Sequence, residues 1–307
     1  MNINMMNERP IVSVAVLAYN SSKYILETLE SAKKQTYERI ELIVSDDAST
    51  DNTVEICKNW IEENRTYFIN VKLLTTSQNS GTSSNCNRLI NNAVGEWVKL
   101  IAADDILFED CIEKCVKFVN EHPSVKWMVG KTLKYENIID EDHLIKSDTL
   151  YTSQRLSVLT GSLEEQQAAI LNYSFIEAPA LFINAKILRD VGGYNEKYQL
   201  LEDWPMNKKL LEAGYKCYFL DDYIVGYRKN ENSVFNINSK LFNMRYQESL
   251  LEFYKSELFE YHNNCYRLNK RFHYLLCLFY QKMRLNNTKK INKISYSALN
   301  KLIDILL

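Results

Sequence analysis

The feature that most constrains the fold is a regular alternation of short apolar runs and helical patterns over about the first 120 residues. Four apolar runs are typical of buried strands: 11–18, 40–45, 71–75 and 97–102. Helical patterns separate and follow them, at 21–35, 53–64, 83–94 and 108–121. Strands that alternate with helices pair in parallel, so the sequence predicts a doubly wound, mostly parallel α/β sheet flanked by helices.

Polar residues follow three of these four predicted strands. They are Tyr19-Asn20, Asp46-Asp47 and Asp104-Asp105. Open α/β sheets bind ligands beyond the carboxyl ends of their strands, so two acidic pairs at equivalent positions favour a binding site there. A solvated turn that caps the following helix is the alternative for each pair, and it is the role expected of Asp51.

The second half of the chain continues the pattern less regularly. We expect strands at 126–135, 180–183, 217–220 and 224–227, and helices at 164–172 and 203–213. Residues 136–160 are polar and predict a long loop, of the kind that often acts as a lid. Residues 241–285 predict helix, rich in Tyr, Phe and Leu. We therefore expect a domain over 8–235, with halves of about 8–125 and 126–235, and a helical extension over 236–307.

The composition is that of a globular protein, with 46% hydrophobic and 25% charged residues. Seven cysteines without a CxxC pair predict reduced thiols in the cytoplasm and argue against a cysteine-bound metal. The first ten residues are polar and lack a secretory signal, and no apolar run is long enough to span a bilayer. We expect a protein that is soluble or lies against a membrane.

The C-terminal segment is basic, whereas the rest of the chain is acidic. From Lys240 onward there are 12 Lys and Arg against 5 Asp and Glu, in a chain of net charge −2. Two readings stay open: packing on the protein itself or on a second copy in a homo-oligomer, and contact with an anionic membrane. The acidic remainder disfavours nucleic acid. The residues concerned are Arg267, Lys270, Arg271, Lys282, Arg284, Lys289 and Lys290, with Tyr266, Phe272, Tyr274 and Phe279.

Five segments, in order, resemble the motifs of GT-A fold, family 2 glycosyltransferases. They are SVAVLAYNSSKYILETLESAKKQTY, ELIVSDDASTDNT, NSGTSSNCNRLINNAVGEWVKLIAADDI, VGGYNEKYQLLEDWPMNKKLLEAGY and GYRKNENSVF. The resemblance covers roughly residues 10 to 235 and leaves out the basic extension. It implies a GT-A-type sheet and transfer of a sugar from a nucleotide donor.

The resemblance also implies roles for individual residues. Asp105 is expected to bind Mn²⁺ or Mg²⁺ beside the diphosphate, and Asp104 to accept hydrogen bonds from the ribose hydroxyls. Asp46 or Asp47 would pair with the uracil imide, Tyr19 would contact the base, and Asn20 would hold its loop. The full set implied for the nucleotide-sugar is Ala18, Tyr19, Asn20, Asp46, Asp47, Asn79, Gly81, Asn87, Arg88, Asp104 and Arg228.

For the reaction, the resemblance identifies Asp203 as the base that deprotonates the acceptor hydroxyl, with Glu202 on the donor sugar. Arg228 would stabilise the departing diphosphate. Helix capping by Asp203 and a surface ion pair by Arg228 are the alternatives. The implied activity is inverting transfer of a hexose or N-acetylhexosamine from a UDP-sugar to a saccharide. As in relatives that build bacterial surface polysaccharides, the acceptor would be carried on a polyprenyl diphosphate at the cytosolic face of the inner membrane.

Three positions depart from the family pattern. Ala102 stands where many relatives have another Asp, Cys86 replaces a usual Arg, and Asn230, two residues after Arg228, stands where a His is common. These departures weaken the metal assignment and leave open a degenerate nucleotide-sugar-binding scaffold of an envelope-assembly complex. A sugar nucleotidyltransferase is disfavoured, because AYNSSKY lacks the Gly-rich, basic phosphate loop that such an enzyme needs.

Overall fold

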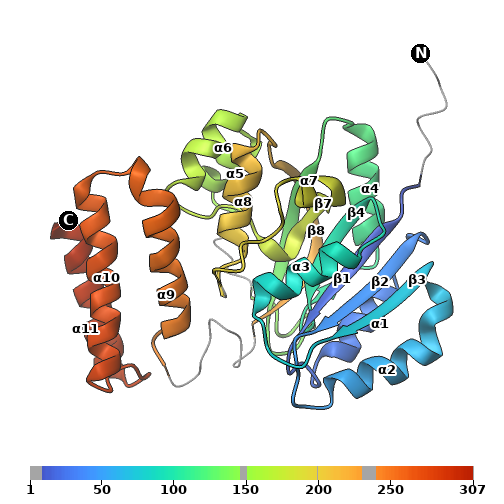
Figure 1. Cartoon of the computed structure of the whole chain (residues 1–307), viewed down its shortest axis with the longest axis horizontal. Coiled ribbons are helices and arrows are strands. Elements are labelled where there is room, and N and C mark those ends of the chain that lie inside the picture. The colour runs from blue at the N-terminus through green and yellow to red at the C-terminus, as the bar shows by residue number, and fades with distance from the viewer. Residues whose placement is uncertain (1–8, 146–150, 199, 230–239, 307) are drawn as a thin grey trace. The chain divides into compact units, whose positions relative to one another are not determined.

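A mixed eight-stranded sheet with the order β3-β2-β1-β4-β7-β6-β8-β5 organises the first part of the chain. The computed structural model describes residues 9–145, 151–198, 200–229 and 240–306 (Figure 1). Within these residues the strands are β1 (Val12–Ala18), β2 (Ile40–Asp46), β3 (Asn70–Thr75), β4 (Trp97–Ala102), β5 (Ile106–Leu107), β6 (Trp127–Glu136), β7 (Leu181–Asn184) and β8 (Tyr218–Lys229).

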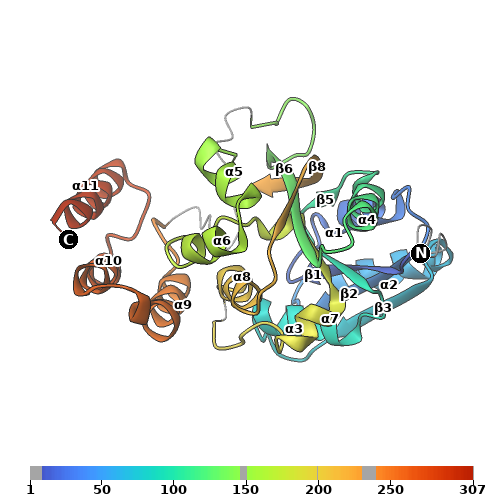
Figure 2. The same cartoon turned by 90° about the horizontal axis from the view of Figure 1, so that it is seen from above.

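The N-terminal half confirms the predicted α/β pattern. Strands β3, β2, β1 and β4 are parallel neighbours, and β1 and β2 are almost wholly buried. Helices α1 (Ile25–Lys33) and α2 (Thr53–Asn64) contact each other on one face of the sheet, and α3 (Thr82–Asn92) and α7 (Ala185–Asp190) contact each other on the opposite face (Figure 2). Helix α4 (Cys111–Glu121) follows the acidic turn after β4. Apolar runs buried on both faces explain this arrangement.

The second half of the sheet is antiparallel where its pairings are described. Strand β7 pairs antiparallel with both β4 and β6, and the short β5 pairs with β8. Several expectations need correction. The predicted loop 136–160 contains α5 (Ser153–Thr160), the two strands expected within 217–227 are the single strand β8, and β5 and α7 were not predicted. Helices α6 (Leu163–Ile170) and α8 (Asp203–Glu212) lie close to their expected positions.

A second compact unit combines residues 196–202 with the described part of 229–307. Its helices are α9 (Met244–Phe253), α10 (Asn264–Lys282) and α11 (Lys290–Leu306), so the helix expected over 241–285 is broken. A π turn and a 3₁₀ turn between Tyr254 and Tyr261 make the break. Phe242, Cys277 and Tyr280 form a small core in this unit.

Two further observations concern the whole described chain. None of its helices is both long enough and apolar enough to cross a lipid bilayer. No disulfide joins cysteines within residues 9–145, 151–198, 200–229 and 240–306.

Candidate functional site

The three polar strand ends lie at one edge of the sheet. Strands β2, β1 and β4 are parallel neighbours, with Ala18 level with Asp46 and Leu17 level with Ala102. Two backbone bonds extend this register past the strands, because Asp47 N donates to Ala18 O at 2.9 Å and Ala103 N donates to Leu17 O at 2.9 Å. The turns that carry the acidic pairs therefore start side by side.

The turn after β1 presents an exposed aromatic ring. Tyr19 keeps 49% of its surface exposed, and Asn20 adopts φ 49°, a left-handed conformation that Asn tolerates well. The backbone N–H of Asn20 donates to Ser49 Oγ at 2.7 Å, and the side-chain Oδ1 of Asn20 accepts from Thr50 N at 2.8 Å. The carboxamide thus ties the β1 turn to the β2 turn and leaves the ring of Tyr19 open to a ligand.

Asp46, the last residue of β2, is engaged in its own turn. The carboxylate is buried and accepts hydrogen bonds from both the amide, at 2.9 Å, and the hydroxyl of Ser49. Asp51 accepts from Thr53 N at 3.0 Å, and so serves the first turn of α2 as expected.

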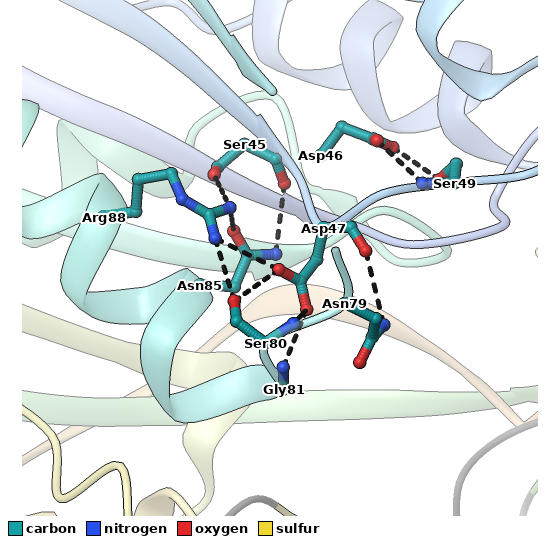
Figure 3. Close-up of polar contacts among 9 residues, drawn as sticks. All are labelled: Ser45, Asp46, Asp47, Ser49, Asn79, Ser80, Gly81, Asn85 and Arg88. Carbon is teal, nitrogen blue, oxygen red and sulfur yellow. Dashed lines mark hydrogen bonds and ion pairs between the residues drawn. The ribbon is translucent and has the colours of Figure 1, made fainter. Parts of the chain in front are cut away.

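Asp47 is the centre of a dense polar cluster (Figure 3). Its carboxylate accepts from Ser80 N at 2.9 Å, Gly81 N at 2.8 Å, Ser80 Oγ at 2.6 Å and Arg88 Nη2 at 3.1 Å. Four donors use the lone pairs that a carboxylate offers. Gly81 has φ 87°, which suits glycine at the start of α3. Asp47 therefore holds the 79–81 loop against the sheet edge.

Arg88 is equally occupied in the same cluster. Its second terminal nitrogen donates to Ser45 Oγ at 3.0 Å and to Asn85 Oδ1 at 3.1 Å (Figure 3). Asn79 lies at the rim, where its exposed carboxamide donates to Asp47 O at 3.3 Å. In this structure the guanidinium shapes the loop, and Asn79 is the side chain of the cluster that faces solvent.

Asn87 connects α3 to a distant segment. Its Nδ2 donates to Tyr194 O at 2.9 Å, and its Oδ1 accepts from Tyr194 N at 2.7 Å. Gly193 has φ 67°, and a Cβ at this position would lie 2.6 Å from Asn87 Oδ1. The structure therefore places the Asn87 carboxamide on the loop that leads toward Asp203, and the contact expected between Asn87 and the nucleotide stays a prediction.

The acidic turn after β4 is anchored on both sides. Asp105 N donates to Ala102 O at 3.2 Å, and Thr28 Oγ1 of α1 donates to Asp105 O at 2.7 Å. The Asp105 carboxyl is 1% exposed; its Oδ1 accepts from Arg228 N at 2.8 Å, and its buried Oδ2 has no partner among the described residues. Burial, followed by the charge of Asp104, raises the pKa of Asp105 well above its ordinary value.

Arg228 is a buried connector in this conformation. Its guanidinium donates to Asp104 O at 2.8 Å, to Asn137 O at 2.6 Å and to Glu27 Oε2 at 2.5 Å, and its side chain is 1% exposed. The group also lies over the Tyr24 ring, 4.3 Å from its centre. The contact expected with a diphosphate would need this set of bonds to open, so the geometry favours a positioning role for Arg228. Asn230 lies outside the described residues.

Asp203 is the first residue of α8 and is half-buried. Burial raises the pKa of its carboxyl, against hydrogen bonds from its own amide and that of Trp204, which lower it. Two contacts fix the helix: Trp204 Nε1 donates to Ile170 O at 2.7 Å, and Lys209 Nζ donates to Gly193 O at 2.7 Å. The neighbouring Glu202 is also half-buried.

One turn along α8, Asn207 is fully buried, and neither polar atom of its carboxamide has a partner among the described residues. Residues four apart share a helix face, so Asn207 lies on the same face of α8 as Asp203, one turn further along. An unpaired buried carboxamide costs about 1–3 kcal/mol. Sequence analysis did not single out this residue, since one polar residue in a helical pattern gives no signal.

Two further side chains near the acidic turn were not predicted. Burial raises the pKa of the Tyr227 hydroxyl, and the charges of Asp105, Asp104 and Glu177 raise it further. Glu177 is held by hydrogen bonds from Thr132 Oγ1 at 2.5 Å and Tyr151 OH at 3.3 Å. Tyr227 precedes Arg228 in the segment GYRKNENSVF, which resembles a family motif, whereas no sequence pattern indicates a functional role for Glu177.

The acidic turn has the chemistry of a weak divalent-cation site. No group of three or more His, Cys, Asp or Glu side chains in the described part of the chain could hold a metal. The unpartnered Oδ2 of Asp105 and the adjacent carboxylate of Asp104 are hard oxygen donors that suit Mn²⁺ or Mg²⁺. The residues fit a cation whose other ligands come from water and a bound anion.

Comparison with known proteins is consistent with this geometry. The sequence profile described as "Glycosyl transferase family 2" matches residues 13–175, just over half of the chain. Among curated proteins, "Glycosyltransferase GlyG" of Streptococcus pneumoniae is 25% identical over 249 residues, which cover 81% of this chain and 79% of the relative. "Putative glycosyltransferase EpsE" of Bacillus subtilis is 34% identical over 117 residues, covering 38% and 41%.

Solved structures share the fold. TarS 1-349 of S. aureus, in complex with UDP-GlcNAc, matches with a TM-score of 0.58 and 23% identity, over 85% of this chain and 72% of that chain. The mannosyltransferase PcManGT of Pyrobaculum calidifontis, in complex with GDP-Man and Mn²⁺, matches with a TM-score of 0.56 and 18% identity, over 81% and 64%. A longer S. aureus TarS chain is covered to only 43% of its length.

Proposed function

The chain belongs to glycosyl transferase family 2, and from this membership and its site we propose that it moves a hexose or N-acetylhexosamine from a UDP-sugar to a saccharide hydroxyl. The observation that carries the proposal is the convergence of the β1, β2 and β4 turns at one sheet edge, with acidic pairs on two of them. A UDP donor is supported by the UDP-GlcNAc complex of TarS, which shares the fold.

The uridine would lie against the β1 turn and the 79–81 loop. The exposed Tyr19 ring offers a face on which the base stacks. Because the carboxylate of Asp47 already accepts four bonds, we assign to it the shaping of the 79–81 loop. The uracil imide then meets that loop, where the Asn79 carboxamide is exposed.

The diphosphate would lie beyond β4. Asp105, through its unpartnered Oδ2, and Asp104 would hold Mn²⁺ or Mg²⁺, which neutralises the charge of the departing UDP. Arg228 would hold the turn in place, because its amide donates to the Asp105 carboxyl group and its guanidinium donates to the backbone carbonyl of Asp104.

Asp203 would act as the general base. Its carboxylate accepts the proton of the acceptor hydroxyl, whose oxygen attacks the anomeric carbon from the side opposite UDP. The bond from that carbon to the UDP oxygen breaks, UDP keeps the electron pair, and the configuration inverts. The raised pKa of Asp203 suits a base that works near neutral pH. Glu202, next to the base, would contact the donor sugar.

For the acceptor we propose a polyprenyl-diphosphate-linked saccharide at the cytosolic face of the inner membrane, in surface-polysaccharide synthesis. The support is the basic charge of the C-terminal segment, which suits an anionic membrane. A homo-oligomer remains a prediction.

The test is UDP release from a panel of UDP-sugars, with Mn²⁺ or with a chelator, and with or without membrane lipid extract. We expect one donor to be turned over with Mn²⁺, and turnover to fall at least 100-fold in Asp203→Asn and in Asp105→Asn. The exposed Asp190→Asn is the matched control and keeps full activity. NMR of the product anomer reports inversion. Donor binding without turnover on any acceptor would instead favour the scaffold alternative.

A further inference from the structure

The excess of basic over acidic residues near the C-terminus lies in the segment that contains α10 and α11, and not in the segment that contains α9. Residues 264–306, which contain α10 and α11, carry nine Lys and Arg and one acidic residue, Asp304. Residues 240–263, which contain α9, carry three basic and four acidic residues. The sequence shows that the C-terminal segment as a whole is basic. The structure places this excess of basic residues on the pair of helices α10 and α11, here called the α10–α11 hairpin.

Each helix of this hairpin also exposes an apolar face. On α10 and the residue that follows it, spacings of three and four residues separate Leu268, Phe272, Leu275, Phe279 and Met283, which are 42% to 58% exposed. On α11, Ile291 and Ile294 are three residues apart, and so are Leu302 and Ile305; these four side chains are 48% to 80% exposed. Nine large apolar side chains on two helices exceed the scattered exposure of ordinary surfaces.

These faces are not the contact between the two helices. The contact is made by other residues: Tyr280 OH donates to Ser295 Oγ at 2.7 Å, Cys277 Sγ lies 3.1 Å from Tyr296 OH, and His273 Nε2 lies 2.8 Å from Asp304 Oδ1. The hairpin is therefore closed by its inner faces, and its apolar outer faces contribute nothing to that closure.

Helix α9 and the turn after it contact an earlier part of the chain within the same unit. Glu252 forms an ion pair of 2.7 Å with Lys197, and Tyr198 OH lies 2.6 Å from Ser256 Oγ in the turn that follows α9. Tyr198 also packs edge-on against Phe253. Helix α9 and this turn thus hold Lys197 and Tyr198, which lie a few residues before Asp203 in the chain.

We propose that the α10–α11 hairpin binds the surface of an anionic lipid bilayer, with its apolar outer faces in the headgroup and acyl boundary. The exposed Lys282, Arg284, Lys289, Lys290 and Lys301 meet the lipid phosphates. A second copy of the chain is a poorer occupant, because two hairpins with nine basic residues and one acidic residue each would repel.

This surface connects the membrane to the reaction. Lipid binding by the hairpin would bring the whole chain, and with it Asp203, to the membrane that carries a lipid-linked acceptor. That connection rests on the proposed function, whereas lipid binding by the hairpin does not.

The experiment is co-sedimentation of the full chain with vesicles of phosphatidylcholine alone or mixed with phosphatidylglycerol. We expect binding only to the mixed vesicles, and a loss of at least tenfold in affinity for Leu275→Ser/Phe279→Ser. Lys289→Glu/Lys290→Glu should show a similar loss and a weaker salt dependence. The matched control Ile69→Ser/Val94→Ser removes residues of similar exposure, 49% and 58%, and should bind as the wild type does.

Equal binding to both kinds of vesicle, or unchanged binding of Leu275→Ser/Phe279→Ser, would overturn the proposal. So would a dimer, seen by analytical ultracentrifugation, that this double variant alone dissociates. UDP affinity measured by calorimetry should be unchanged in all three double variants. Vesicle binding without turnover of any UDP-sugar would count against the proposed function only.

Discussion

Arg228 and Asp105 lie 123 residues apart in the chain, yet the amide of Arg228 donates to Asp105 Oδ1 at 2.8 Å. The bond joins the end of β8 to the turn after β4. The guanidinium of the same arginine reaches the carbonyl of Asp104. One residue thus contacts both members of the acidic pair from outside their own turn, and the conformation of that turn depends on it.

Arg228→Lys should therefore lower the stability of the fold, and any loss of turnover should follow from that destabilisation. Lysine cannot replace the three separate guanidinium bonds, and each partly buried backbone carbonyl left unpaired, that of Asp104 or Asn137, costs about 1–3 kcal/mol. We expect the free energy of unfolding to fall by roughly 2–4 kcal/mol, measured by urea denaturation. Lys229→Ala, one residue on and exposed, is the control and should unfold as the wild type does. Full stability with lost turnover would instead indicate direct contact with the diphosphate.

Sequence could predict those parts of the fold that depend on the local, periodic spacing of apolar residues. Strand β4 and helix α2 begin and end where their apolar patterns do, and three strand ends lead to the site edge. The contacts that sequence could not predict belong to side chains whose partners are far along the chain. Asn87 bonds to Tyr194, 107 residues away, and neither local composition nor spacing encodes such a contact.

Asp47 and Arg88 should behave as a coupled pair. Removing either leaves the other buried with an unmatched charge, while removing both leaves a smaller polar loop. In a double-mutant cycle of Asp47→Ala and Arg88→Ala, we expect a coupling free energy of about 1–3 kcal/mol in stability. The affinity for UDP should fall in each single variant, because both hold the 79–81 loop. Additive effects on stability and UDP affinity would contradict this assignment.

The raised pKa of Asp203 predicts a pH dependence with a definite sign. Burial favours the protonated form in the folded state, so this group stabilises the fold below the ordinary pKa of Asp. That contribution is lost as the pH rises through the raised folded pKa. Asp203→Asn stays neutral, so it should match the wild type near pH 3.5 and become more stable than the wild type at higher pH. Melting temperatures across pH 3.5–8 measure the difference, and parallel curves would contradict the assignment. The variant should lack transferase activity throughout.

Variants of Tyr19 test where the uracil base of the donor binds. Stacking of a nucleobase on an aromatic ring contributes about 1–3 kcal/mol, so Tyr19→Ala should weaken UDP binding roughly tenfold or more. Tyr19→Phe keeps the ring and should bind within about twofold of the wild type. Because the ring is half exposed, neither change should shift the melting temperature appreciably. Calorimetric titration with UDP makes the comparison. Equal losses in both variants would assign the contact to the hydroxyl instead.

Two fully buried carboxamides predict opposite effects of the same substitution. Gln166 is saturated: its Nε2 donates to Leu159 O and Cys217 O at 3.0 and 2.8 Å, and its Oε1 accepts from Cys217 N at 2.9 Å. Asn207 has no partner among the described residues. Gln166→Leu should lower the free energy of unfolding by about 2–4 kcal/mol, whereas Asn207→Leu should raise it by roughly 1 kcal/mol. Urea denaturation of both variants tests the two signs.

Under the role proposed for Asp203 as general base, the unpartnered carboxamide of Asn207 would lower stability for the sake of function. Asn207 can hold an ordered water against the Asp203 carboxylate, which Leu cannot. We therefore expect the more stable Asn207→Leu to turn over at least tenfold more slowly, with the acid limb of its pH–rate profile moved to higher pH. Asn207→Gln should recover part of the rate. A stabilised Asn207→Leu with an unchanged rate and pH profile would show that the carboxamide has no part in the reaction.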